Sequence, residues 1–256
     1  MAVQDSRDPP PPEPPAAEPE ADPPQPSGAP AEPGAEEVLG IAAHEIKNAL
    51  GPLAMTLQLC ERRATSGQEV SLDDLRFARA QVRRIGEMAN ELLDVARIEH
   101  GRLPLKLAPV DLCSLVQSTV DAFRRASRRP VVCDLPPTSV MHTADGERLT
   151  AVLVNYLDNA AKYTPEHTPI EVRMSRAGDR VRVAVTDHGP GVLPDDRERL
   201  FDRYYRAPET SASVSGLGLG LYICRAIAEQ HGGAAGVDSQ PGKGATFWLD
   251  LHLGQT

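Results

Sequence analysis

The sequence Asn155-Tyr-Leu-Asp-Asn159-Ala-Ala-Lys162-Tyr163 lies inside a segment, residues 145–163, whose apolar spacing predicts one long helix. Asn155 and Asn159 are four residues apart and Lys162 is three further on, so a helix places all three on one face. Asparagine lowers helix propensity, so two of them on one face need a reason. Amide oxygens suit Mg²⁺, and a lysine neutralises phosphate. A solvated polar face is, at this point, an equally good explanation.

A second stretch, Val185-Thr-Asp187-His-Gly189-Pro-Gly191, follows an alternating segment that predicts a strand. A carboxylate fixed at a strand end can accept a hydrogen bond from an exocyclic amine such as that of adenine. The two glycines let backbone approach a flat base closely. Taken alone, an ordinary turn after a strand explains the same residues.

A third stretch, Gly216-Leu-Gly218-Leu-Gly220-Leu221, precedes a segment with helical periodicity. Glycines before a helix N-terminus expose N–H groups at the positive end of the helix dipole, which suits phosphates. The pattern G-x-x-x-x-G-K-[ST] of P-loops is absent, and so is the Rossmann spacing after an early strand. A nucleotide bound here would therefore use neither of those folds.

Around these stretches the chain alternates between helical and strand-like segments after Pro104. The sequence predicts helices at 111–125, 145–163 (with Asp145 as N-cap) and 217–230, strands at 131–135, 170–175, 180–186, 235–238 and 245–251, and a polar loop at about 188–216. Neighbouring strand pairs favour a mixed sheet with helices on one face, an α+β class.

The segment before Pro104 has the pattern of a helical hairpin. One helix starts near Val38, Ser66 and Gly67 suggest a turn, and Ser71 with Asp74 resembles a capping box. In the second helix a heptad seam is expected at Leu75, Ala78, Val82, Ile85, Ala89, Leu92 and Ala96. Two such helices cannot cover both of their apolar faces alone, so the hairpin is expected to form a homodimeric four-helix bundle.

Composition bounds the possibilities further. The chain has 256 residues, of which 41% are hydrophobic, and a formal net charge of −9. Residues 1–37 carry nine acidic residues and one basic residue, so the remainder is nearly neutral and offers no basic face for nucleic acid. Residues 1–35 are rich in Pro, Ala and Glu and are expected to be disordered; a docking site for a proline-recognising domain is the alternative.

The sequence shows no signal for export or for insertion into a membrane. The N-terminus has neither the basic start nor the apolar run of a signal peptide, and no stretch approaches the roughly 18 apolar residues of a membrane span. The four cysteines show no metal-ligand spacing, which is typical of reduced thiols in a cytosol. We therefore expect a cytoplasmic protein without a membrane span.

In order along the chain, Asn155–Tyr163, Asp187–Gly191, Leu200–Arg206 and Gly216–Leu221 resemble the N, G1, F and G2 boxes of two-component sensor histidine kinases. The resemblance implies a Bergerat-type α/β sandwich that binds ATP, as in gyrase and Hsp90. The implied organisation is a disordered segment at 1–35, a dimerisation and phosphotransfer hairpin at 36–102, and a catalytic ATP-binding domain at 103–256.

The same resemblance implies a role for individual residues. Asn159 would ligate Mg²⁺, with Asn155 near the phosphates, and Asp187 would read the adenine amine. Phe201 would anchor a mobile lid by packing. The remaining ATP-binding candidates are Lys162, Tyr163, Gly189, Gly191, Arg206, Gly216, Gly218, Gly220 and Leu221.

In the first helix, Ala43-His44-Glu45-Ile46-Lys47-Asn48-Ala49-Leu50 resembles the H box of the family. By that resemblance His44 is the phosphoacceptor, Glu45 the general base, and Asn48, one turn from His44, orients water against the phosphoaspartate of a partner. The usual proline after that asparagine is Ala49 here. Pro52 could bend the helix instead, because its ring clashes with the carbonyl of residue 48.

The expected function is therefore ATP- and Mg²⁺-dependent autophosphorylation on His44 and phosphotransfer to an aspartate of a response regulator, with phosphatase activity as a further possibility. Two alternatives stay open. One is a Bergerat-fold ATPase or serine kinase without a histidine acceptor, and the other is a non-catalytic dimerisation scaffold. Label from γ-labelled ATP that is acid-labile and alkali-stable distinguishes the first from a histidine kinase, and nucleotide binding without label indicates the second.

Overall fold

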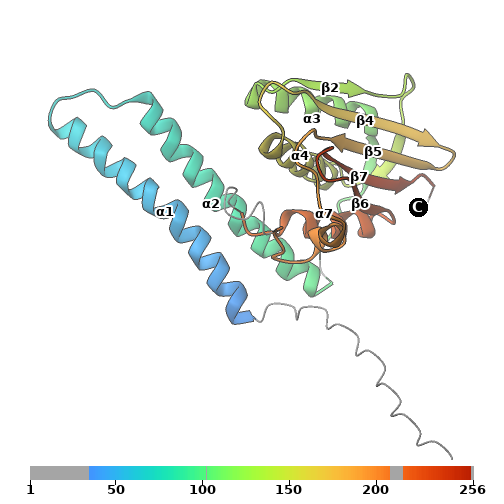
Figure 1. Ribbon diagram of the computed structural model, residues 1–256, viewed down its shortest axis with the longest axis horizontal. Coiled ribbons are helices and arrows are strands. Elements are labelled where there is room, and N and C mark those ends of the chain that lie inside the picture. Colours follow the sequence, from blue (N-terminus) through green and yellow to red (C-terminus); the bar gives the residue numbers. More distant parts are fainter. Residues whose placement is uncertain (1–34, 102, 208–215, 255–256) are drawn as a thin grey trace, which may run out of the picture. The chain divides into compact units, whose positions relative to one another are not determined.

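The computed structural model describes residues 35–101, 103–207 and 216–254, with side chains from Gly40 onward. The disorder expected for residues 1–35 concerns residues that, Ala35 apart, lie outside this description. The described N-terminal part is a hairpin of two helices, α1 (Ala35–Thr65) and α2 (Leu72–Glu99), which run side by side (Figure 1). Helix α1 runs without interruption through Pro52.

Helix α2 begins at the expected capping residue. The Ser71 side chain accepts a hydrogen bond from the Asp73 N–H at 3.2 Å and caps α2. The reciprocal half of a capping box is missing, because the Asp74 carboxylate pairs with Arg63 near the end of α1. An ion pair across the hairpin thus replaces a bond within one helix.

The heptad period of α2 is present, but only every second position of the predicted seam is covered. Ala78, Ile85 and Leu92 are buried or half-buried, whereas Leu75, Val82, Ala89 and Ala96 are exposed. Met88 and Val95, which the prediction left out, are buried. Helix α2 contacts both α1 and α7. The apolar residues of α2 that face neither helix stay open in one chain.

The rest of the chain is an α/β domain built on a mixed sheet. Its strands are β2 (Val131–Asp134), β4 (Ile170–Ala177), β5 (Arg180–Thr186), β7 (Ala245–His252) and β6 (Ala234–Ser239), in that spatial order. Strands β2 and β4 pair in parallel, with Val131 opposite Ile170, and the other neighbours are antiparallel. The expected α+β class and all five strands are confirmed.

Three helices accompany this sheet: α3 (Leu112–Ser127), α4 (Gly146–Tyr163) and α7 (Gly220–Gln230). Asp145 caps α4 as expected, by accepting from the Arg148 N–H at 3.1 Å. Helix α7 begins three residues later than predicted, because Gly218 adopts a φ of +69° that no α-helix accommodates. The loop predicted at 188–216 contains a short helix, α5 (Pro194–Arg197), and a 3₁₀ turn, η1 (Arg199–Phe201).

A second small sheet was not expected. Strands β1 (Ala108–Asp111) and β3 (Met141–Ala144) pair antiparallel outside the five-stranded sheet. With four residues each and Pro109 in one of them, they carry too little alternation to be recognised from sequence.

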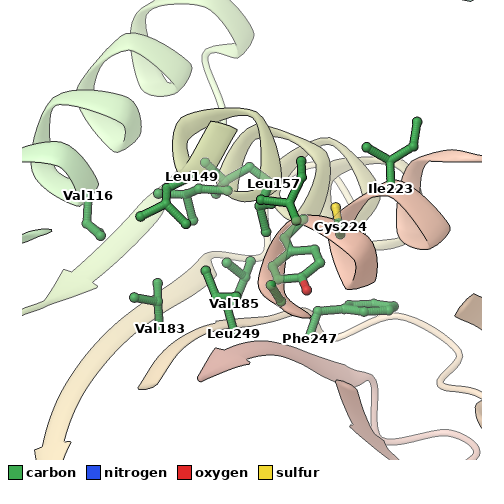
Figure 2. Close-up of a cluster of buried hydrophobic side chains, with 14 of the residues drawn as sticks. Val116, Leu149, Leu157, Val183, Val185, Ile223, Cys224, Phe247 and Leu249 are labelled. Carbon is green, nitrogen blue, oxygen red and sulfur yellow. The ribbon is translucent and has the colours of Figure 1, made fainter. Parts of the chain in front are cut away.

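The main core lies between one face of the sheet and the three helices. Strand β5 alternates, with Val181, Val183 and Val185 buried. Figure 2 shows the two sides meeting, and its labelled residues are Val116 of α3, Leu149 and Leu157 of α4, Ile223 and Cys224 of α7, and Val183, Val185, Phe247 and Leu249 of the strands. Burying each such aliphatic side chain contributes about 1.5–3 kcal/mol. The packing holds α4 and α7 in fixed positions.

Protonation of a buried histidine should make the stability of this domain pH-dependent. His142 on β3 is 9% exposed, and its Nε2 has no hydrogen-bond partner within the described structure. Burial, and secondarily the neighbouring His231, lowers the pKa of His142. The unfolded chain therefore takes up this proton first. The contribution of neutral His142 to the stability of the folded domain is therefore complete above pH about 6.5, the usual pKa of histidine. It is lost as the pH falls from there toward the lower pKa that His142 has in the folded protein.

We expect the free energy of unfolding to fall less steeply between pH 7 and pH 5 in His142→Leu than in the parent protein. The two slopes should differ by at most the uptake of one proton, because the substitution removes one titrating group. Urea unfolding of both proteins at several pH values measures the difference, in which contributions from other groups cancel. Identical slopes for the two proteins would contradict this prediction.

None of the helices in the described ranges is both long and apolar enough to cross a membrane.

Candidate nucleotide site

A cavity of about 380 Å³ opens beside α4, and most of its wall comes from the three stretches singled out in the sequence. The predicted residues that line it are Asn155, Asn159, Lys162, Tyr163, Asp187, Gly191, Arg206, Gly216, Gly218, Gly220 and Leu221. Segments more than sixty residues apart in sequence thus meet at one site. The cavity falls within the 300–1,000 Å³ range typical of small-molecule sites.

One wall is the polar face of α4. The Asn159 Nδ2 donates a hydrogen bond to the Asn155 Oδ1 at 3.1 Å, so the two amides orient one another. No other described residue hydrogen-bonds the Asn159 side chain, and its Oδ1 is therefore left for a ligand. Lys162 continues the same wall and is exposed. The α4 face therefore presents an amide oxygen and an ammonium group to the cavity.

Asp187 lines the cavity directly after the end of β5. Its side chain is buried, and its Oδ1 accepts from the Gly189 N–H at 2.8 Å and from the Ala245 N–H at 3.3 Å. The second carboxylate oxygen has no partner in the described part of the chain. Burial raises the pKa of Asp187, and the two N–H donors oppose that rise. The arrangement leaves one fixed acceptor atom for a ligand.

The glycine-rich stretch is held against the rest of the site by close backbone contacts. The Tyr204 N–H donates to the Gly218 carbonyl at 3.0 Å, and a Cβ on Gly218 would lie 2.8 Å from the Tyr205 carbonyl oxygen. At the start of α7, a Cβ on Gly220 would lie 2.1 Å from the Asn155 Nδ2. Backbone crowding and the positive φ restrict residue 218 to glycine. At residue 220 a side chain would displace the Asn155 amide, and glycine lets the N-terminus of α7 reach the polar face of α4.

The segment opposite is built from α5 and η1. The Tyr205 hydroxyl donates to Asp196, and the Arg199 guanidinium stacks on the Tyr205 ring at 4.2 Å. Phe201 does not line the cavity; it is buried beneath η1, with the Arg225 guanidinium 4.6 Å from its ring. Phe201 therefore packs η1 onto α7, and its role as the anchor of a mobile lid stays a prediction.

Gly189 also lies outside the cavity wall and acts through its N–H on Asp187. Several lining residues were not predicted, namely Glu91, Pro190, Val192, Leu193, Asp196, Leu200, Tyr205, Ala207, Leu217, Leu219, Ala245 and Phe247. Five of them (Pro190, Leu200, Tyr205, Leu217 and Leu219) lie inside the motifs quoted from the sequence, and most of the others are close to those motifs in sequence. Glu91 is not, because it belongs to α2.

Glu91 brings a carboxylate to the cavity from the helical hairpin. Burial is the main cause that raises the pKa of Glu91 to about 7, Lys162 lowers it and Glu87 raises it. Asp158 on α4 also has a raised pKa, again through burial. A second contact of α2 is the ion pair of Asp94 with Arg148 of α4, at 2.6 Å. The hairpin thus supplies one residue of the cavity wall.

The predicted phosphoacceptor lies on α1, apart from the residues that line the cavity. The His44 and Asn48 side chains are exposed, one turn apart on the same face. The Glu45 side chain is buried, and its Oε2 accepts from the Arg84 Nη2 of α2 at 3.2 Å. Within the described residues Glu45 makes no hydrogen bond to His44. The structure brings the nucleotide candidates together, and leaves the three hairpin candidates separate from them.

Known proteins resemble both parts of the chain. Residues 35–101 match the family described as the His Kinase A (phospho-acceptor) domain, and residues 144–255 match the histidine kinase-, DNA gyrase B- and HSP90-like ATPases. The adaptive-response sensory kinase SasA of Thermosynechococcus vestitus is 34% identical over 85% of this chain and 60% of its own length. The sensor-like histidine kinase SenX3 of Mycobacterium bovis is 31% identical over 82% of this chain and 52% of its own.

The structure of full-length ShkA, solved in complex with AMPPNP, superimposes with a TM-score of 0.59 at 26% identity, over 84% of this chain and 45% of ShkA. The chain spans about half to three fifths of the length of the two curated relatives. Both domains occur here in the order in which the motifs were found, and the chain belongs to the sensor histidine kinases of two-component systems.

Proposed function

We propose that the protein uses ATP to phosphorylate itself on His44 and passes the phosphoryl group to an aspartate of a response regulator. The observation that carries this proposal is the cavity beside α4, in which an amide pair, a lysine, a fixed carboxylate oxygen and a glycine-rich helix start converge. An exposed imidazole on the preceding hairpin supplies the acceptor.

ATP fits the cavity with its base at Asp187. The free carboxylate oxygen accepts a hydrogen bond from the adenine amine, while the Gly189 and Ala245 N–H groups hold the other oxygen. The phosphates then extend toward Asn155 and the start of α7, where N–H groups and the helix dipole favour anions. Lys162, Tyr163 and Arg206 contact phosphate or ribose from the cavity wall.

The residues present also suit Mg²⁺. The metal prefers hard oxygen ligands, and the Oδ1 of Asn159 is such an atom beside the phosphate end of the cavity. When bound, the ion neutralises charge on the phosphates. The described residues contain no cluster of three or more His, Cys, Asp or Glu side chains that could hold a metal without the nucleotide. Asn159 would hold Mg²⁺ through its Oδ1 once the nucleotide is bound.

The chemical step is a displacement at phosphorus. A neutral imidazole is a competent nucleophile near pH 7. One ring nitrogen of His44 attacks the γ-phosphorus, the bond to the β-phosphate oxygen breaks, and ADP leaves with its electron pair. The proton on the other ring nitrogen passes to Glu45. Asn48, exposed one turn along α1, is placed to orient water for dephosphorylation of the regulator.

The exposed apolar residues of the hairpin support a homodimer. Leu50 and Leu57 on α1, and Leu75 and Val82 on α2, are seven residues apart in each helix and remain exposed in one chain. A twin hairpin would cover them in a four-helix bundle. We also propose a cytoplasmic location, which ATP as phosphoryl donor supports.

Incubating the full chain with γ-labelled ATP and Mg²⁺ tests the proposal. We expect label that is lost in acid and retained in alkali, because a phosphoramidate bond breaks when its nitrogen is protonated. Acid-stable, alkali-labile label would instead indicate a serine kinase. ATP binding without label, or hydrolysis without label, would indicate a scaffold or an ATPase and contradict the proposal.

A further inference from the structure

Beside the phosphoacceptor, a charged side chain occupies a position where the hairpin would normally place an apolar one. The inner face of α1 carries Ala42, Ala49 and Cys60, all buried, and Glu45 lies on that face between the two alanines, 8% exposed. A carboxylate there loses most of its hydration, which costs free energy unless a partner compensates. The alanines offer no hydrogen bond.

Arg84 provides that compensation from the other helix. Its Nη2 donates to the Oε2 of Glu45 at 3.2 Å. The Arg84 side chain is 34% exposed and that of Glu45 is 11% exposed, so the pair lies at the rim of the hairpin interior, where it is screened less than a surface pair. The two residues are 39 positions apart, and only the closed hairpin brings them together.

The contact engages one carboxylate oxygen and leaves the other. Oε2 accepts from Arg84, and no described residue hydrogen-bonds Oε1. The contact at Oε2 restricts where the carboxylate group lies, and Oε1 is the oxygen left to accept a proton. His44 precedes Glu45 directly and is exposed on the neighbouring part of the helix surface.

We propose that Arg84 is a positioning residue: it holds Glu45 by one oxygen so that the other can take the proton of His44 during phosphorylation. This inference rests on the proposed function. Nucleophile, base and orienting group form the three-member arrangement in which a base is held by a third side chain. Here the orienting member comes from the second helix, so an intact hairpin is needed for a fully active acceptor.

His44, Glu45 and Arg84 have different roles in the proton transfer. As one ring nitrogen of His44 bonds to phosphorus, the other ring nitrogen loses its proton to the second carboxylate oxygen of Glu45. The Glu45–Arg84 contact stays in place, and the proton later leaves to water. Without Arg84, the buried carboxylate loses its charged partner and turns toward solvent, away from the position in which it serves as a base.

The test compares the neighbouring arginines of α2. We expect Arg84→Ala to lower kcat for autophosphorylation about 10- to 100-fold with an unchanged KM for ATP, because the cavity is untouched. Arg84→Lys, which keeps a cation, should retain more activity than Arg84→Gln. The matched control is Arg83→Ala, since the Arg83 side chain is 74% exposed and pairs only weakly with Glu87 at 3.7 Å; it should behave as the parent protein does.

A double substitution separates positioning from general damage. In a Glu45→Gln background, Arg84→Ala should cause no further loss, because the arginine acts through the glutamate. Additive losses would overturn the inference, as would wild-type kcat in Arg84→Ala. If Arg84→Ala reduces helical content, the Lys and Gln variants decide, and equal rates for these two would also overturn it. Labelling of His44 in the parent protein is measured in the same series, so failure of the proposed function is seen separately.

Discussion

Replacing His44 with glutamine is expected to reduce labelling by γ-labelled ATP at least about 1,000-fold, to background. An amide nitrogen has no nucleophilic lone pair, so the displacement at phosphorus has no attacking atom. The side chain is exposed and lies outside the cavity, so binding of ATP and the helical content should not change. Quantitative labelling, together with ATP titration of the same preparation, measures both.

Two controls make this result specific. His167, an exposed histidine after α4 that does not line the cavity, can be replaced with glutamine and should leave labelling intact. Asn48→Ala, on the same face of α1 as His44, should also be labelled normally. Residual acid-labile label in His44→Gln would move the acceptor to another histidine, and a loss of ATP binding would show that the hairpin and the cavity are coupled.

Replacing Asp187 with asparagine should weaken ATP binding about 100-fold, or about 2.8 kcal/mol. The Gly189 and Ala245 N–H groups both point at Oδ1, so the amide oxygen of the new side chain must take that position. Its NH₂ group then faces the adenine amine, and two donors meet without an acceptor. Calorimetric titration of the full chain with ATP measures the loss.

A nucleotide with the opposite hydrogen-bonding pattern sharpens this test. Inosine triphosphate carries a carbonyl where adenine carries the amine, so the parent protein should prefer ATP and Asp187→Asn should prefer inosine triphosphate. Asp238→Asn, at an exposed position on β6, is the matched control and should keep the original preference. Equal weakening for both nucleotides in Asp187→Asn would mean that the substitution damages the site and that Asp187 does not read the base.

The nucleotide cavity could be predicted because its residues are clustered in sequence. Asn155, Asn159 and Lys162 share one helix face by spacing alone, and the structure places them on one wall. The glycines before α7 were recognisable as a helix start that suits phosphates, although the sequence did not reveal that Gly220 makes room for Asn155. That requirement depends on the crossing of two helices far apart in the chain.

The remainder depends on contacts between segments, which local patterns do not encode. Glu91 has the appearance of any charged residue on a helix, and the Glu45–Arg84 contact requires knowing how α1 and α2 are rotated about their axes. The same uncertainty explains the seam of α2, whose period was right while Val82 proved exposed and Met88 buried. A heptad fixes spacing, and the neighbouring helices decide which half of it is covered.

The parallel pairing of β2 with β4 affects the order in which the domain assembles. Val131 and Ile170 meet only after the intervening chain, which includes all of α4, has looped back along the sheet. Closing so long a loop is entropically slow, whereas β4 and β5 are joined by a tight turn and can pair early. The helix that carries the polar wall of the cavity is therefore also the crossover on which completion of the sheet waits, and we expect substitutions on its inward face to slow refolding as well as lower stability.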